Sequence, residues 1–338
     1  MADVHDTAAA PSAPFGRSVD GRTVFVTGAF GLIGSWLAAA LLERGARVVV
    51  QGRGPRPASP LVLDGTHERC RVADADLDDE AALTDVLARE GVEVVFHLAA
   101  QAIVGAAAQS PRPTFEANIA GTWTLMEACR AAGVERVVVA SSDNAYGRST
   151  ALPHTEDTPL RATHAYDVSK AAADLVARSY GATFGMAVAT TRLSNVYGGG
   201  DGNRSRLIPE AVRAALEGRA PVVRSDGTPR RDFLYVADAV EAYLAVADLL
   251  AAGRGWGEPF NAGAGSPRAV LDVVELVCAL AGTGVRPDIR GSGVPAGELD
   301  EHWADAGRLR AATGWAPSVS LEDGLRRTIE WHRAHPEA

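Results

Sequence analysis

The sequence predicts an α/β fold with a doubly wound parallel sheet, because short β-branched segments alternate with helical segments through much of the chain. Strands are expected near residues 23–27, 47–51, 70–73, 93–97, 135–140 and 187–192. The crossover helices are rich in alanine, for example at 117–132 and 171–180. A glycine-rich turn follows the first strand, and polar residues follow the fifth. Both lie beyond the carboxyl ends of strands, where open parallel sheets bind ligands.

The turn after the first strand has the spacing of a dinucleotide-binding site. Its three glycines are Gly28, Gly31 and Gly34, and an apolar helical stretch follows them. Glycines here allow a tight turn and a close approach to a pyrophosphate, whose charge the helix N-terminus stabilises. A tight turn without a ligand is the alternative. The residues expected to contact the cofactor are Gly28, Phe30, Gly31, Leu32, Ile33 and Gly34.

The second predicted strand ends at Gly52 and Arg53 without an acidic residue. An acid there would bind the ribose 2′-hydroxyl of NAD. Arg53 could instead meet a 2′-phosphate, which favours NADP. The alternative is a solvated arginine in a proline-rich loop, with NAD as the cofactor.

Tyr166 and Lys170 lie four residues apart at the head of an alanine-rich helical stretch, and so share one helix face. A neighbouring ammonium favours the phenolate, lowers the tyrosine pKa from its usual value of about 10 and makes the phenol a useful base. On its own the pair fits a solvated helix face. The glycine turn and the polar cluster that follows the fifth strand favour an active site.

That polar cluster contains Ser142, Asp143 and Asn144. A parallel strand delivers these side chains to the ligand edge of the sheet. A serine or Asx turn that closes the strand is the alternative.

Together these motifs resemble the extended short-chain dehydrogenase/reductase family, in its sugar-nucleotide epimerase/dehydratase branch. The resemblance runs from about Arg22 to the C-terminus and includes residues 96–101, 195–198, 231–238, 314–317 and 321–325. It implies a Rossmann-type domain at 21–195, a smaller α/β substrate domain at 196–338 with interleaved segments, and a tightly bound NAD(P)+. Further cofactor contacts are implied for Asp76, Leu77, Leu98, Ala99 and Ala100. For the aspartate-rich segment around Asp76, a helix N-cap cluster is the alternative.

The resemblance also assigns roles in catalysis. Tyr166 would remove a proton from a sugar hydroxyl, and Lys170 would lower its pKa and hold the nicotinamide ribose. Ser142 would hydrogen-bond the reacting oxygen, so that a 4-keto sugar forms. Arg231 and Asn195 would hold the nucleotide phosphates, with Arg204 and Arg206 as further candidates or as ordinary surface charges.

The outcome of the reaction depends on Asp143 and Asn144. In 4,6-dehydratases an Asp and a Glu usually stand at these positions; Asp143 matches, whereas Asn144 cannot act as a carboxylate base. Features at 31–37 and 195–209 favour the CDP-glucose dehydratase subgroup. We therefore expect an NDP-hexose 4,6-dehydratase, with an NDP-sugar 4-epimerase as the alternative and a non-catalytic dinucleotide sensor as a distant one.

Composition narrows the partners of this 338-residue chain. A formal net charge of −9 argues against nucleic acid and anionic membranes. Residues 1–20 lack the features of a signal peptide and are expected to form a disordered tail. The three scattered cysteines suggest reduced thiols in a cytoplasmic protein, and no metal spacing is present. The resemblance implies a homodimer joined by a four-helix bundle. His97 is expected to have a packing or hydrogen-bonding role.

Overall fold

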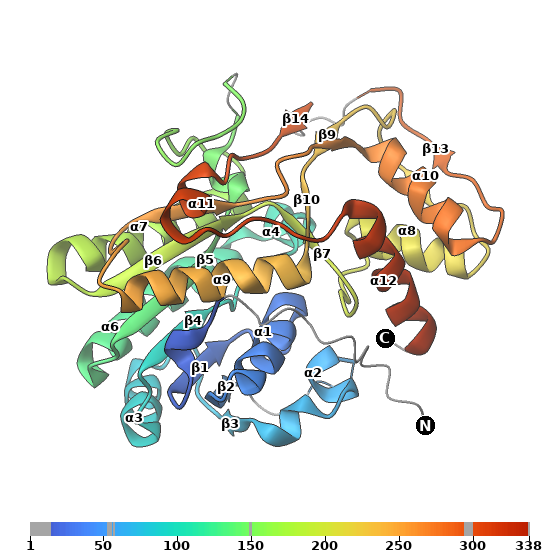
Figure 1. Cartoon of the computed structure of the whole chain (residues 1–338). Coiled ribbons are helices and arrows are strands. Elements are labelled where there is room, and N and C mark those ends of the chain that lie inside the picture. Colours follow the sequence, from blue (N-terminus) through green and yellow to red (C-terminus); the bar gives the residue numbers. More distant parts are fainter. Residues whose placement is uncertain (1–14, 53–55, 57, 149–150, 294–299, 337–338) are drawn as a thin grey trace.

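The computed structural model describes residues 15–52, 56, 58–148, 151–293 and 300–336. At its centre lies a parallel sheet with the strand order β11-β6-β5-β4-β1-β2-β3 (Figure 1). Its strands are β1 (Thr23–Thr27), β2 (Arg47–Gln51), β3 (Arg71–Ala73), β4 (Val94–His97), β5 (Arg136–Ser142), β6 (Ala187–Leu193) and β11 (Pro259–Ala262). The strand order reverses between β1 and β4, as in a doubly wound sheet, so the predicted fold class is confirmed.

Helices cover both faces of this sheet and bury its side chains in two apolar cores. On one face lie α1 (Leu32–Glu43) and α9 (Val236–Ala251); on the other lie α3 (Glu80–Glu90), α6 (Gly121–Ala132) and α7 (Ala165–Phe184). Val24 and Val26 join the first core, whereas Phe25 joins the second. Because both faces are buried, β1, β2, β4 and β5 contain apolar runs (residues 24–26, 48–50, 94–96 and 137–140), which is what made them recognisable.

The helices that carry the site differ from their predicted bounds. The helix expected at 117–132 comprises a π-helical turn, η3 (Glu116–Ala120), followed by α6; the short helix α5 (Pro111–Phe115) precedes them. The helix expected at 171–180 is the longer α7, which includes both Tyr166 and Lys170.

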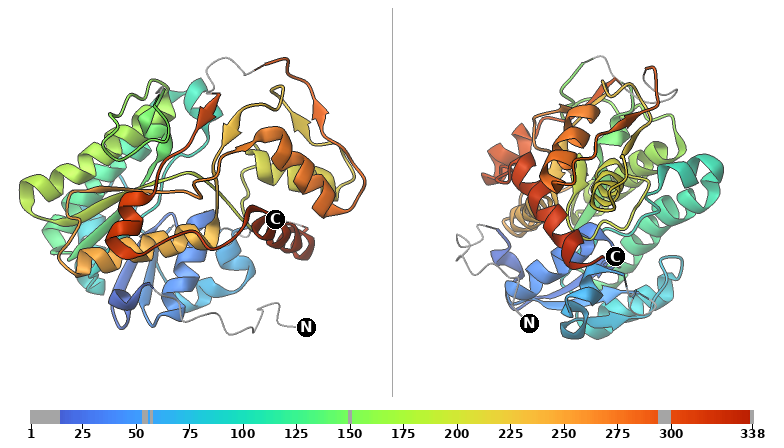
Figure 2. Two further views of the ribbon diagram at one scale, coloured as in Figure 1. Left: turned by 45° about the horizontal axis from the view of Figure 1, so that its top comes forward. Right: turned by 90° about the vertical axis from the view of Figure 1, so that its right-hand side faces the viewer.

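The smaller part of the fold lies to one side of the large sheet (Figure 2). Three helices pack together there: α8 (Leu207–Leu216), α10 (Val270–Ala281) and α12 (Leu321–Ala334). Short strands connect them: β7 (Asn195–Tyr197) with β10 (Phe233–Tyr235), β8 (Val222–Val223) with β13 (Asp288–Ile289), and β9 (Arg230–Arg231) between β12 (Arg268–Ala269) and β14 (Glu301–His302). The remaining elements are η1 (Arg17–Val19), α2 (Pro60–Leu63), η2 (Thr66–Arg69), α4 (Val104–Gln109), η4 (Asp143–Tyr146) and α11 (Gly307–Thr313).

Segments of the C-terminal half return to the large sheet. α9 packs against β5 and β6, and β11 pairs with β6 in parallel register. The expected domain bounds of 21–195 and 196–338 stay a prediction.

The last part of the expected N-terminal tail is folded. Val19 is fully buried, and the backbone N–H groups of Gly16 and Ser18 donate to the carboxylate of Asp248, at 2.7 and 2.9 Å. The prediction was therefore wrong for residues 15–20, because a carboxylate on α9 satisfies this backbone. Residues 1–14 lie outside the described part of the chain. Among the described helices, none has the length and apolarity needed to cross a bilayer.

Candidate active site

The turn between β1 and α1 forms a cradle that side chains would obstruct. Gly28 has a φ of +69°, and a Cβ there would lie 2.6 Å from the backbone nitrogen of Ala99. A Cβ on Gly34 would lie 2.2 Å from the carbonyl oxygen of Gly28. The N-terminus of α1 has no side-chain cap and no acidic residue in its first turn. It lies where the strand order reverses, so it suits the pyrophosphate of a dinucleotide.

Residues after β4 close the other side of this cradle. The hydroxyl of Thr27 accepts hydrogen bonds from the backbone N–H groups of Leu98 and Ala99, each at 3.1 Å. The ring of His97 bonds the hydroxyls of Thr27, at 2.8 Å, and Thr122, at 3.1 Å. Burial, and then the charge of Lys170, lower the pKa of His97 to about 3. His97 is thus a neutral buried residue with the hydrogen-bonding role expected of it.

The expected adenosine contacts are only partly described. Leu77 packs against Gly121, where an added Cβ would lie 3.2 Å from the Leu77 Cβ. The N-cap of α3 is Asp79, which accepts from the backbone N–H of Ala82 at 2.9 Å, so the capping role belongs to Asp79 and not to Asp76. Arg53 lies outside the described residues.

Helix α7 and the end of β5 bring Tyr166, Ser142 and Lys170 to one site. Tyr166 is half-buried, and Ser142 lies beside it and favours a lower pKa. Burial raises the pKa of Tyr166 to about 12, while the charge of Arg206 favours a lower value. This is opposite to the lowering expected from Lys170, whose ammonium instead donates to the carbonyl of Ala140 at 2.6 Å. Burial lowers the pKa of Lys170 itself to about 8.

Asp143 is a buried carboxyl at the start of η4. The hydroxyl of Ser142 donates to its Oδ1 at 3.3 Å. Burial and then the charge of Asp232 raise the pKa of Asp143 to about 7. At neutral pH such a carboxyl is divided between its protonated and ionised forms, which suits a general acid. The backbone N–H of Asn144 donates to Ser142 Oγ at 3.2 Å, so the segment is also a serine turn.

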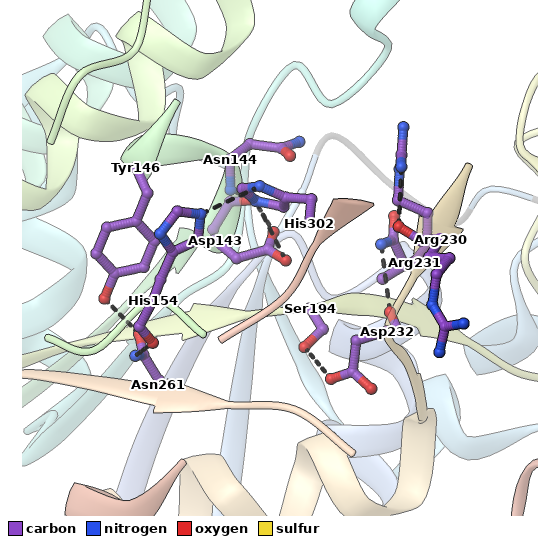
Figure 3. Close-up of polar contacts among 12 residues, drawn as sticks. Asp143, Asn144, Tyr146, His154, Ser194, Arg230, Arg231, Asp232, Asn261 and His302 are labelled. Carbon is purple, nitrogen blue, oxygen red and sulfur yellow. Dashed lines mark hydrogen bonds and ion pairs between the residues drawn. The ribbon is translucent and has the colours of Figure 1, made fainter. Parts of the chain in front are cut away.

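The expected phosphate-binding residues are only partly brought together. Arg231 lies across from Asp143 in Figure 3 and donates to the carbonyl of Arg230 at 2.9 Å. The amide of Asn195 donates to the carbonyl of Asp232 at 3.3 Å, so Asn195 adjoins the same segment. Arg206 bonds Asp201 and the carbonyl of Val196, both at 2.6 Å, and Arg204 is exposed before α8. Arg206 therefore also fixes the loop that precedes α8.

Sequence reasoning missed two residues at the site. His302 lies 3.6 Å from the Asp143 carboxylate, and His154 lies beside His302 (Figure 3). No spacing in the sequence signals this contact. In the described ranges there is no group of three His, Cys, Asp or Glu side chains that could hold a metal ion.

A dinucleotide cradle beside a tyrosine, a serine and a buried lysine defines the class of nicotinamide-dependent short-chain dehydrogenases/reductases. Known proteins narrow this class. The model of the NAD dependent epimerase/dehydratase family matches residues 24–263. The chain is 33% identical over 315 residues to the UDP-glucose 4-epimerase of Mycolicibacterium smegmatis, covering 91% of this chain and 97% of that protein. It is 32% identical over 337 residues to the dTDP-glucose 4,6-dehydratase of Xanthomonas campestris pv. campestris, covering 92% and 93%.

A solved structure gives the same result. The dTDP-glucose 4,6-dehydratase of Streptomyces venezuelae, solved with NAD and TYD bound, matches with a TM-score of 0.82 and 30% identity, covering 93% of this chain and 97% of that chain. The chain therefore belongs to the NAD-dependent epimerase/dehydratase family. It is a sugar-nucleotide dehydratase or epimerase.

Proposed function

We propose that the protein is an NDP-hexose 4,6-dehydratase that converts its substrate into the 4-keto-6-deoxy sugar nucleotide and water. The observation that carries this proposal is Asp143, a buried carboxyl next to Ser142 whose pKa is raised to about 7. Loss of the C6 hydroxyl as water needs a proton donor, whereas a 4-epimerase needs no acid at this place. A carboxyl that stays partly protonated at neutral pH meets that need.

Each residue of the site has a distinct role in this reaction. Tyr166 takes the proton of the sugar C4 hydroxyl, and Ser142, which lies beside Tyr166, holds the same oxygen. A nicotinamide held at the glycine turn would supply the hydride acceptor for C4 and the hydride donor for C6. Loss of water is an elimination across C5 and C6: the C5 proton, made acidic by the C4 ketone, passes to a base other than Asn144, and its electron pair forms the C5=C6 bond. Asp143 gives its proton to the departing C6 oxygen as the C6–O bond breaks, so that water leaves. Arg231 and Asn195 hold the diphosphate.

A 4-epimerase is the second candidate, and Asn144 favours it. A dehydratase needs a base to remove the C5 proton, and the amide of Asn144 cannot act as one. One relative of the chain is a UDP-glucose 4-epimerase. Both reactions begin with the same 4-keto sugar.

A screen with CDP-, dTDP-, UDP- and GDP-hexoses decides between the two. A product lighter than the substrate by one water supports the dehydratase, and an isomer of equal mass supports the epimerase. Asp143→Asn should abolish water loss and leave C4 oxidation, which shows as transient nicotinamide reduction. Unchanged water loss in this variant would remove Asp143 from its role. No turnover of any hexose would favour the non-catalytic sensor.

The resident cofactor is a tightly bound NAD or NADP. Arg53 favours NADP, whereas the family is described as NAD dependent and the related dehydratase holds NAD. Release of the dinucleotide by denaturing the purified protein, followed by chromatography against both standards, identifies it.

We also propose a homodimer in which α6 and α7 of each protomer form a four-helix bundle. Trp123 on α6 and Leu175 on α7 are large apolar side chains that are 47% and 56% exposed, and the two helices contact one another. The cytoplasmic location expected from the cysteines stays a prediction; Cys70, Cys129 and Cys278 are free thiols.

A further inference from the structure

The proposed acid, Asp143, forms a buried array with the imidazole rings of His302 and His154 (Figure 3). Asp143 Oδ2 lies 3.6 Å from Nε2 of His302, and Nδ1 of His302 lies 3.4 Å from Nε2 of His154. The exposed fractions of the three residues are 3%, 2% and 0%. Within the described residues, Asp143 Oδ2 and His302 Nε2 are both buried without a hydrogen-bond partner, and they face each other at 3.6 Å; the backbone of Asp143 also lies near the His302 ring.

Three segments that are distant in sequence hold this array in place. The backbone N–H of His154 donates to the carbonyl of Trp303 at 3.0 Å, and that of Asp305 donates to the carbonyl of His154 at 2.8 Å. The ring of His154 also stacks on Tyr146, with centroids 4.7 Å apart. The Tyr146 hydroxyl in turn donates to Asn261 at 2.6 Å. The His154 ring is therefore fixed by backbone pairing and ring stacking, and this pairing joins His154 to the segment that follows His302.

We propose that His302 is a positioning residue for the acid Asp143, and that His154 fixes the tautomer of His302. This inference rests on the proposed dehydration. The Nε2–H of His154 donates to Nδ1 of His302, which leaves the Nε2–H of His302 to donate to Asp143 Oδ2. The reverse order would bury the Nδ1–H of His154 without an acceptor, because His154 Nδ1 has no partner within the described residues. An orphaned buried N–H is rarer and more costly than an unused lone pair.

The electrostatics favour neutral imidazoles in this array. Burial lowers the pKa of His302 to about 4, helped by the charge of Arg231, and lowers that of His154 to about 4, helped by His302. The other charged groups that face Asp143 are Asp232 and Arg231 from the β9–β10 segment, together with Tyr166 and Asp167 from α7. A neutral N–H steadies the carboxylate that Asp143 becomes when its O–H bond breaks, and it leaves the acidic proton on Oδ1.

His302 also lies next to Arg231, the arginine that is expected to bind the diphosphate. Strand β14 pairs in parallel with β9, and His302 lies opposite Arg231 in the register. The same short sheet thus carries the residue expected to hold the diphosphate and the residue that holds the acid.

Substitution of His302 in the full-length holoenzyme tests the proposal. His302→Phe keeps a ring but removes the donor to the carboxylate, whereas His302→Gln keeps an N–H. His67→Phe, on η2, is the matched control. We expect His302→Phe to lower kcat for water loss by on the order of tenfold to a hundredfold, the range for a hydrogen bond to a charged group. KM and dinucleotide content should stay unchanged, and His302→Gln should recover most of the loss.

The pH profile separates positioning from a merely structural role. Without the donor, the ionised form of Asp143 is less stable, so the alkaline limb of kcat that reports its loss of a proton should move to higher pH in His302→Phe and not in His302→Gln. An unmoved limb in His302→Phe would overturn the proposal. So would recovery no better in His302→Gln than in His302→Phe.

A readout that needs no turnover tests the arrangement of the three side chains separately from the proposed dehydration. Nitrogen-15 NMR of labelled histidines should show His302 as the neutral Nε2–H tautomer at pH 7, with a resonance that shifts in Asp143→Asn. A charged His302, or the Nδ1–H tautomer, would overturn the arrangement. If the hexose screen gives only isomers, the proposed dehydration fails while this NMR result still stands or falls by itself.

Discussion

The glycine turn offers a matched pair of substitutions that separates folding from cofactor binding. In Gly34→Ala the new Cβ would lie 2.2 Å from the carbonyl oxygen of Gly28 and 2.7 Å from the Cα of Ala29. Both contacts are with backbone, so relief requires movement of the turn. In Gly31→Ala the nearest atom would be the same carbonyl oxygen at 3.4 Å, and the φ of −87° is accessible to any residue. Only the first change obstructs the protein itself.

The magnitudes follow from these contacts. Overpacking costs roughly 1–3 kcal/mol, and a backbone clash of this depth places Gly34→Ala near 3 kcal/mol. With an unfolding entropy of about 2.1 cal/mol/K per residue over 338 residues, that value corresponds to a lowering of Tm by about 4 °C. Gly31 is the N-cap of α1, where replacement of glycine by alanine costs less than about 1 kcal/mol. Gly31→Ala should therefore fold with near-native stability, yet lose affinity for the dinucleotide, because its methyl group stands at the helix N-terminus that the pyrophosphate approaches.

Two measurements on each variant test this reasoning. Thermal unfolding gives the stability of the protein stripped of cofactor, and the absorbance of released dinucleotide gives the cofactor content. A Gly31→Ala protein with full cofactor content would place the pyrophosphate elsewhere. A Gly34→Ala protein with unchanged Tm would show that the turn and α1 are not packed as described.

Three further outcomes are expected. Folding raises the pKa of Asp143 from about 4 to about 7. Ionisation of Asp143 therefore lowers the stability of the fold as the pH rises from 4 to 7, and the loss is complete above pH 7. Asp143→Asn should be more stable than the parent in urea at pH 8, by about 4 kcal/mol at most, and this gain should fade towards pH 4. Asp174 accepts two hydrogen bonds from the buried Arg192, at 2.8 and 3.0 Å. In the same assay, Asp174→Ala should lower the free energy of unfolding by about 3–5 kcal/mol. Asp85→Ala, which breaks the exposed ion pair with Arg89, should lower it by less than about 1 kcal/mol. Leu175→Glu should convert the proposed dimer into monomers in sedimentation velocity, and an unchanged sedimentation coefficient would exclude the bundle.

Much of the large sheet could be predicted because its strands are buried on both faces. β1 and β2 have the predicted bounds, and the next four strands differ by one or two residues. β11 was missed because it is short, begins with a proline and includes the polar Asn261, whose amide is satisfied by the carbonyls of His154 and Asp305, each at 3.1 Å. No periodicity signals a strand whose place depends on such contacts.

The site shows the same division. Tyr166, Ser142 and Asp143 could be predicted because each lies at a strand end or a helix start, where position follows from topology. His302 could not, because it reaches Asp143 only through the pairing of β14 with β9, between segments some seventy residues apart. The direction of the Tyr166 pKa shift was wrong because spacing reveals a neighbour but not which atom that neighbour contacts.

Binding of the substrate diphosphate should help to keep Asp143 protonated. Arg231 is the cation that lowers the pKa of Asp143, against the opposing effects of burial and Asp232. A diphosphate bound at Arg231 would offset that charge, so the pKa of Asp143 should rise further in the complex and the carboxyl should hold its proton more firmly until C6–O cleavage. The alkaline limb of kcat, which reports the complex, should then lie at higher pH than that of kcat/KM, which reports the free enzyme. Arg231→Gln should bring the two limbs together; limbs that already coincide in the parent enzyme would mean that substrate charge does not reach the acid.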